Sequence, residues 1–146
     1  MKEGAALLSR QKGIRVEYLP ETTSTNDEAR DRKYSHGDII VAGCQSAGRG
    51  QRGNSWSSRP GDNLTFSVVL EPHYVPADVQ FLLSQTISLS ITDMLARYDI
   101  NARIKWPNDI YAADSKIVGI LIENEISGGT ISRSIACPLD TSPSPR

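Results

Sequence analysis

One stretch organises the chain: Val41-Ala-Gly-Cys-Gln-Ser-Ala-Gly-Arg-Gly-Gln-Arg-Gly-Asn-Ser-Trp56. The short apolar run from Ile39 to Ala42 predicts a buried strand that leads directly into this loop. The glycines of the loop allow backbone N–H groups to converge on an anion. Arg49 and Arg52 add planar, permanently charged donors that match phosphate or carboxylate oxygens. The stretch therefore predicts an anion-binding loop at the end of a strand.

The loop differs from two common nucleotide-binding motifs. It has no Gly-Lys-Ser/Thr ending, which excludes a P-loop, and no helical pattern follows it, which argues against a dinucleotide fingerprint. A surface loop that only turns the chain is one alternative. An Arg-Gly segment that contacts RNA is another, although such segments are usually long and repetitive. The loop alone leaves these alternatives open.

Composition limits the class of protein. A chain of 146 residues suits a single domain with a real core, and its 38% apolar and 23% charged residues are typical of globular proteins. A formal net charge of −1 provides no general attraction for nucleic acid or anionic membrane. No apolar run approaches transmembrane length, and the two cysteines form neither a disulfide framework nor a zinc-type cluster. We therefore expect a cytoplasmic protein with reduced thiols and no membrane partner.

Alternation of apolar and polar residues predicts two half-buried strands, over residues 14–19 and 63–70. The apolar face of the second strand comprises Leu64, Phe66, Val68 and Leu70. Between the strands, Ser24, Thr25 and Asn26 are suitable N-caps and acidic residues follow them, which predicts the start of a helix. Their polar side chains either cap this helix or face a polar ligand.

The clearest helix is predicted over residues 77–98. Its apolar residues recur at i, i+3, i+4 and i+7, and we expect this stripe to face the core rather than to form a groove for a partner. The stripe comprises Val79, Leu82, Leu83, Ile87, Ser90, Ile91, Met94, Leu95 and Tyr98.

Three further strands are predicted after this helix, and polar residues lie at their ends. The strands cover residues 102–106, 117–122 and 130–136, with a hairpin turn at 127–129. Lys105, Asn108 and Asp109 lie at a strand end, where binding groups often gather on α/β scaffolds. A glycine inside a strand, Gly119, suggests close approach of a ligand or of another backbone.

The last ten residues follow a different pattern. Three of the eight prolines in the chain fall in the last nine residues, and the other residues there are mostly small or polar. We expect the folded domain to cover residues 1–136 and residues 137–146 to form a disordered tail that does not continue the sheet.

Four segments together resemble the catalytic domain of biotin–protein ligases, the enzymes that attach biotin to a carrier domain of biotin-dependent carboxylases. They are Ser24-Thr25-Asn26, Gln45 through Trp56, Lys105-Trp-Pro-Asn-Asp109 and Lys116-Ile-Val-Gly-Ile-Leu121. The resemblance covers roughly residues 14–136. It implies a mixed β-sheet with flanking helices, shared with lipoate ligases and related to class II aminoacyl-tRNA synthetases. The pattern of elements alone supports only the α+β class.

The resemblance also implies a two-step reaction. Biotin carboxylate would attack the α-phosphate of ATP to give biotinyl-5′-AMP and pyrophosphate, and a lysine of the carrier domain would then attack the mixed anhydride. Because an anionic nucleophile approaches a polyanion, charge neutralisation and positioning must dominate the first step. Mg²⁺ on the phosphates would contribute to this neutralisation.

Similarity to the family assigns a role to each motif. The implied biotin-binding residues are Ser24, Thr25, Gln45, Gly48, Arg49, Lys116 and Gly119. The implied ATP- and adenylate-binding residues are Arg49, Gly50, Arg52, Trp56, Asn108 and Lys116, with Trp56 packing on the adenine. The implied catalytic residues are Arg49, Lys116 and Asp109, of which Asp109 would orient the carrier lysine or help to deprotonate it.

The sequence departs from the family at two places. Gln51 stands where many members carry an arginine that helps to retain the adenylate, so this role is not transferred to it. The Gly-Ile-Gly-type turn that normally follows the last predicted strand is absent, so we expect an incomplete domain of low stability, weakly active or inactive. No helix-turn-helix pattern precedes the domain, so we expect no DNA partner, while a homodimer is compatible with the resemblance.

Two rival functions follow from these observations. A lipoate or octanoate–protein ligase would use the same chemistry on another acid. A fragment that binds biotin or its adenylate without transferring it belongs to a different class. The unusual tail favours this second rival, whereas the presence of Arg49, Asp109 and Lys116 argues against it.

Overall fold

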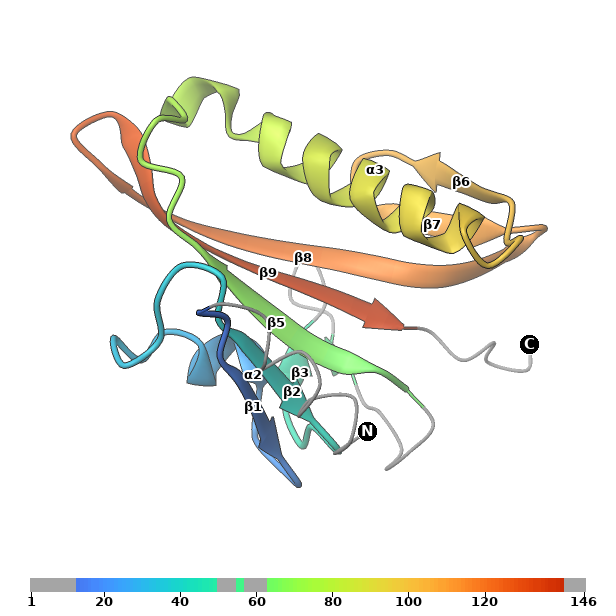
Figure 1. Ribbon diagram of the computed structural model, residues 1–146, viewed down its shortest axis with the longest axis horizontal. Helices are drawn as coiled ribbons and strands as arrows, with labels where there is room; N and C mark the ends of the chain where they lie inside the picture. Colours follow the sequence, from blue (N-terminus) through green and yellow to red (C-terminus); the bar gives the residue numbers. More distant parts are fainter. Residues whose placement is uncertain (1–12, 50–54, 57–62, 141–146) are drawn as a thin grey trace.

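The computed structural model describes residues 13–49, 55–56 and 63–140, which form a seven-stranded mixed sheet with helices (Figure 1). Across the sheet the strands are β1 (Val16–Leu19), β2 (Ile39–Ala42), β5 (Thr65–Leu70), β9 (Thr130–Asp140), β8 (Ser115–Ser127), β7 (Asp109–Ala112) and β6 (Ala102–Lys105). β1 and β2 are parallel, and the other neighbouring strands of this sheet are antiparallel. β3 (Gly48–Arg49) and β4 (Ser55–Trp56) form a separate antiparallel pair. The expected α+β class and mixed sheet are confirmed.

Helices lie on the two opposite faces of the sheet. α2 (Thr25–Glu28) contacts β2, β5 and β9, whereas α3 (Phe81–Ala96), which follows the 3₁₀ turn η2 (Ala77–Val79), contacts β6, β7 and β8. Figure 1 shows α3 running along the β6–β8 side of the sheet and α2 beside β1 and β2. Among the described residues, no helix combines the length and apolarity needed to cross a bilayer.

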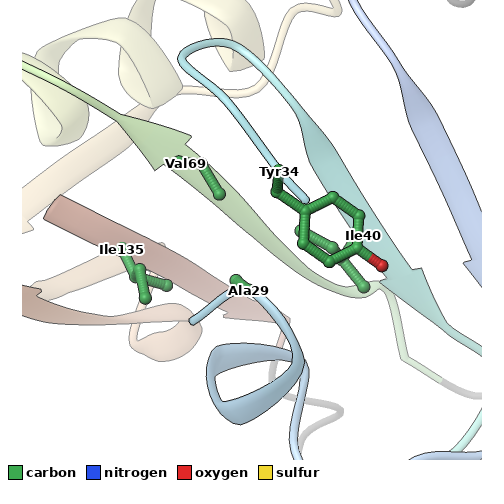
Figure 2. Close-up of a cluster of buried hydrophobic side chains, with 5 residues drawn as sticks. All are labelled: Ala29, Tyr34, Ile40, Val69 and Ile135. Carbon is green, nitrogen blue, oxygen red and sulfur yellow. The ribbon is translucent and has the colours of Figure 1, made fainter. Parts of the chain in front are cut away.

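The main core lies between α2 and the sheet. Ala29, Tyr34, Ile40, Val69 and Ile135 form a buried cluster on this face (Figure 2). Full burial of a side chain such as Ile40 or Ile135 stabilises the fold by about 1.5–3 kcal/mol. The core therefore fixes α2, and with it the turn that carries Ser24, Thr25 and Asn26.

The predicted apolar stripe of the long helix is only partly buried, which corrects the expectation that it forms core. Leu83 packs with Val75 and Ile131 in a second cluster. By contrast, Leu82 and Tyr98 are 50% and 72% exposed. The helix packs mainly against β6, β7 and β8, and much of its apolar surface stays exposed.

The burial of β5 is also the reverse of the prediction. Its polar face, with Thr65 and Ser67, is fully buried, whereas the apolar residues Phe66 and Val68 on the other face are only half-buried. The reason is that α2 covers the face with Thr65 and Ser67, while α3 packs mainly against β6, β7 and β8.

Strand β9 differs from the expected ending at residue 136, because it continues through Pro138 to Asp140. β5 pairs with β9 at Thr65–Leu139 and again from Val68–Ala136, and Pro138 falls in the interruption between these pairs. A strand tolerates proline where a ladder bond is already missing. The sheet therefore includes four of the residues expected in the tail, and residues 141–146 lie outside the described part.

The β8–β9 hairpin is longer than predicted, since β8 covers Ser115–Ser127 rather than residues 117–122. The turn expected at 127–129 is confirmed, with Gly128 and Gly129 at φ +59° and +80°. Such left-handed conformations favour glycine and suit a tight hairpin. A shorter hairpin joins β6 to β7 through the Trp106–Pro107 cis peptide and pairs Lys105 with Asp109.

Candidate functional site

The register of the sheet places the separate sequence motifs on one face. Thr65 pairs with Leu139, Leu139 with Gly119, and Gly119 with Asp109. Directly paired residues share a face, and neighbouring strands are ~4.8 Å apart, so this row spans roughly 14 Å over four strands. Two residues further along β5, Ser67 projects from the same face. These residues form a floor, named here the site floor, which extends from α2 to Asp109.

At one end of the floor, Gln45 holds the first turn of α2. Both the backbone N–H and the hydroxyl of Thr25 donate to Gln45 Oε1, over 2.7 and 3.0 Å. Gln45 follows β2 and forms an isolated bridge with Thr22, which keeps its side chain against the turn. Thr25 and Gln45 are both buried, so this contact is a rigid polar corner.

The structure does not support the alternative in which the side chains of Ser24–Asn26 only cap the helix. Ser24 occupies the N-cap position with extended backbone, but its side chain makes no capping hydrogen bond. Instead Ser67 Oγ lies 2.8 Å from Thr25 Oγ1 and 2.6 Å from Asn26 Oδ1, within hydrogen-bonding distance of both. The polar atoms of this turn therefore face the site floor.

Three polar residues of the floor were missed by the sequence reasoning. Ser67 joins the polar corner, and the Cys137 thiol lies 3.7 Å from Thr25 Oγ1. Burial raises the pKa of the Cys137 thiol, which keeps it in the neutral form. Thr65 Oγ1 is buried and has no hydrogen-bond partner among the described residues. Alternation along β5 does place Thr65 and Ser67 on one face, which could have identified them. The opposite face is apolar, however, and was therefore predicted to be the buried one.

At the other end of the floor, Lys116 and Asp109 form an ion pair. Lys116 Nζ lies 2.8 Å from Asp109 Oδ1, and both side chains are largely shielded from solvent. A Cβ added at Gly119 would lie 3.1 Å from both Cε and Nζ of Lys116. The close approach predicted at this glycine therefore involves the Lys116 side chain, which lies across the strand at Gly119.

Asn108 is anchored to the same strand. Its side-chain amide donates to the Ile120 carbonyl over 3.3 Å, and its own carbonyl accepts from the Ile120 N–H over 2.7 Å. These contacts fix the turn that precedes Asp109. Lys105, at the end of β6, lies over the ring of Tyr111 at 5.5 Å from its centroid.

Arg49 lies near α2 rather than near Lys116. Its guanidinium pairs with Asp27 and lies 3.7 Å from Glu123 Oε1. Glu123 in turn accepts hydrogen bonds from Asn26 Nδ2 at 2.9 Å and from Arg30 Nη2 at 3.1 Å. Arg49 therefore sits at the rim of the polar corner, with its charge balanced by carboxylates.

The other predicted loop residues are described only in part. Gly48 is buried in β3 and its backbone pairs with that of Trp56 in β4. Gly50, Gln51 and Arg52 lie outside the described residues. The structure thus brings Ser24, Thr25 and Gln45 together at one end of the floor. It brings Asn108, Asp109, Lys116 and Gly119 together at the other end.

Comparison with known proteins gives consistent matches. The profile of the Biotin/lipoate A/B protein ligase family matches residues 16–140. The bifunctional ligase/repressor BirA of Escherichia coli K12 is 38% identical over 120 residues, covering 80% of this chain and 37% of that protein.

Two solved structures show the same fold. Biotin acetyl coenzyme A carboxylase synthetase from Helicobacter pylori, with bound biotinylated ATP, has a TM-score of 0.71 at 25% identity and covers 88% of this chain and 61% of that chain. Biotin protein ligase from Leishmania major, in complex with biotinyl-5-AMP, has a TM-score of 0.65 at 26% identity and covers 90% and 59%. The chain thus spans less than two thirds of each of these relatives.

Proposed function

Because this chain belongs to the Biotin/lipoate A/B protein ligase family, we propose that it activates biotin with ATP to biotinyl-5′-AMP. We further propose that it transfers biotin to a lysine in the biotin carrier domain of a carboxylase. One observation carries this proposal: the Thr25–Gln45 corner and the Lys116–Asp109 pair lie on one face, at opposite ends of the site floor. This arrangement suits a ligand that is polar at one end and anionic at the other.

The polar corner would hold the biotin head group. A cyclic urea presents one carbonyl acceptor and two N–H donors, which fit a site built from Ser24, Thr25 and Gln45. Thr65 Oγ1, buried without a partner among the described residues, supplies a further polar atom on the floor. A buried polar group without a partner is costly. A site that contains one therefore favours a ligand whose donors and acceptors can pair with it.

The same corner supports biotin over lipoate. The dithiolane ring of lipoate carries no N–H or O–H donor and only weak sulfur acceptors, so it would leave polar atoms of the corner unmatched. A lipoate or octanoate ligase remains the alternative within the same family, and a non-catalytic biotin or adenylate binder is the alternative outside it.

The cationic groups would serve the first step. Lys116 lies beside the floor, where its ammonium would neutralise the biotin carboxylate and the α-phosphate as the two anions approach. Arg49 would act on the same anions from the rim of the corner, with Gly50, Arg52 and Trp56 proposed for the nucleotide. Charge stabilisation of this kind, supplied by preorganised donors, is worth about 10²–10³ in rate per donor in acyl-transfer enzymes.

Asp109 would serve the second step. The amine of a carrier lysine, with an ordinary pKa of about 10.4, is mostly protonated at neutral pH and must lose a proton to attack. The Asp109 carboxylate lies at the start of β7, fixed by its ion pair with Lys116. It would orient the incoming ammonium and accept its proton as the amine attacks the mixed anhydride.

The described residues provide no group of three or more His, Cys, Asp or Glu side chains that could hold a metal ion. Because Mg²⁺ in nucleotide sites is usually bound by one or two carboxylates together with substrate phosphates, the cation expected with ATP would be held mainly by the nucleotide phosphates.

Biotin-dependent exchange of pyrophosphate into ATP tests the proposal on the purified chain, with lipoate as a parallel substrate. Exchange that requires biotin is the expected result. Exchange with lipoate alone would assign the chain to the lipoate branch. Absence of exchange with either acid, in a chain that melts cooperatively, would contradict the proposed adenylation and leave the binding role.

A further inference from the structure

Arg49 is held against α2 by a group of four charged residues, named here the rim cluster: Asp27, Arg30, Arg49 and Glu123. Asp27 pairs with Arg49 and lies 3.8 Å from Arg30, while Glu123 lies 3.1 Å from Arg30 and 3.7 Å from Arg49. The charges of the two cations and the two carboxylates cancel, so the cluster is neutral overall. An anion that approaches Arg49 therefore meets a neutral cluster rather than a free positive charge.

The two carboxylates of the cluster differ in how firmly they are held. Glu123 accepts a hydrogen bond from Asn26, which is itself bound to Ser67, so Glu123 is tied to the polar corner. The Asp27 side chain contacts the two arginines and is 44% exposed. Asp27 is thus the carboxylate that can release Arg49 without disturbing the corner.

We propose that Asp27 is a positioning residue that competes with the anionic ligand for Arg49. This inference rests on the proposed function, which assigns Arg49 to the biotin carboxylate or the α-phosphate. A guanidinium presents a limited number of donors in a fixed plane, so a carboxylate or phosphate that binds it in a bidentate manner must displace Asp27. Glu123 stays in place and keeps the arginine near the site during the exchange.

The expected size of the effect follows from the exposure of the pair. Double-mutant cycles on exposed ion pairs typically give about 0.2–1 kcal/mol, and each 1.4 kcal/mol changes an affinity tenfold, so removing the competition should tighten anion binding by roughly 1.4- to 5-fold. A change of this size is measurable by titration calorimetry.

The test compares Asp27→Asn with Asp31→Asn in the full chain. Both variants remove one negative charge from the same region, but Asp31 pairs with Lys33, whereas the ion pairs of Arg49 are with Asp27 and Glu123. We expect Asp27→Asn to bind biotin and ATP roughly 1.4- to 5-fold more tightly than wild type, and Asp31→Asn to bind them as wild type does. Equal or weaker binding in Asp27→Asn would overturn the inference.

Salt dependence separates competition from a purely structural role. Because Asp27→Asn leaves the rim cluster with a net positive charge, its anion affinity should fall more steeply with added salt than that of wild type or Asp31→Asn. Parallel salt curves would contradict the inference. If wild type binds neither biotin nor ATP, the proposed function fails together with the inference. If wild type and Asp27→Asn bind both ligands equally, only the inference fails.

Discussion

Lys116 Nζ lies 2.8 Å from Asp109 Oδ1, and the lysine side chain runs directly across Gly119. The pairing of Asp109 with Gly119 in the β7–β8 ladder creates this relationship, because it aligns the carboxylate with the one position of β8 that has no Cβ. The ion pair is partly shielded from solvent, so its geometry is better defined than that of a fully exposed pair. Three residues from two strands thus determine where the ammonium is placed.

Replacing Lys116 with Gln should greatly lower the rate of the first chemical step, the formation of the adenylate. The substitution keeps a polar side chain, shorter by one atom, and removes the positive charge, so we expect biotin-dependent pyrophosphate exchange to fall by about 10²–10³. Lys33→Gln is the matched control, because Lys33 pairs with Glu28 and Asp31 away from the site floor. An exchange rate within twofold of wild type in Lys116→Gln would show that Lys116 does not act on the reacting anions.

Substitution of Gly119 by Ala should displace the lysine without unfolding the chain. The added Cβ would lie 3.1 Å from the far end of Lys116, a flexible group that can move by a few tenths of an ångström. We expect a change of less than about 1 kcal/mol in the free energy of unfolding and a larger, roughly 10-fold or greater, loss of exchange activity. Denaturant unfolding and exchange assays on the same preparation distinguish the two effects. A variant with reduced stability but normal activity would contradict the positioning role of Gly119.

The polar corner can be tested by Thr25→Val, which keeps the shape of the side chain and removes its hydroxyl. Gln45 Oε1 would lose one of its two hydrogen bonds from Thr25, and Ser67 would lose a neighbour. We expect a destabilisation of about 1–2 kcal/mol and a weaker affinity for biotin, measured by denaturant unfolding and calorimetry. Thr23→Val is the control, since Thr23 is exposed. Equal effects of the two substitutions on biotin affinity would argue against a special role of the corner.

The environment of Cys137 predicts its reactivity. Because burial raises the pKa of this thiol, the thiolate fraction at pH 8 is lower than for an ordinary cysteine, and access is restricted as well. We expect iodoacetamide to modify Cys44, which is half-buried, faster than Cys137 in the native chain, with the difference lost in denaturant. Peptide mass spectrometry measures both rates. Faster native modification of Cys137 would contradict its buried position beside Thr25.

The sequence could predict the strands and the site motifs because their signals are local. Alternation, the Gly-Gly hairpin turn and the polar turn before α2 depend on neighbouring residues, and the strand around Ile40 lies close to where it was expected. Which face of β5 is buried depends on where the helices pack, and this is set by contacts between residues far apart in sequence. Alternation alone therefore pointed to Phe66 and Val68, whereas the structure buries Thr65 and Ser67.

Pairs within the site show the same limit. Nothing near Lys116 in the sequence indicates that its side chain crosses Gly119 toward Asp109, because the contact depends on the register of β7 against β8. The Asp27–Arg49 contact likewise joins residues 22 positions apart. Motifs identify which residues take part in such a site, but register and packing decide how they are combined.

Arg133 was also missed in the sequence-based predictions, and the contacts of this residue lead to a prediction about stability. This arginine lies on β9 and is 2% exposed. Its Nη2 donates to the carbonyls of Ala29 and Tyr34 at 2.9 and 3.0 Å, and its Nη1 lies 3.0 Å from Glu71 Oε1. The guanidinium thus holds the chain that leaves α2, on which the position of the polar corner depends.

Arg133→Met should therefore destabilise the fold by about 3–5 kcal/mol, because it leaves the Glu71 carboxylate and two buried carbonyls without their partner. The matched control is Arg32→Met, which breaks an exposed pair with Glu125 and should cost less than about 1 kcal/mol. Denaturant unfolding of the three proteins gives both differences. Arg133→Lys should recover part of the loss, since an ammonium can still pair with Glu71 but cannot reach both carbonyls in the same plane. Similar stabilities for Arg133→Met and Arg32→Met would show that α2 is held by its apolar contacts with Ile40, Val69 and Ile135 alone.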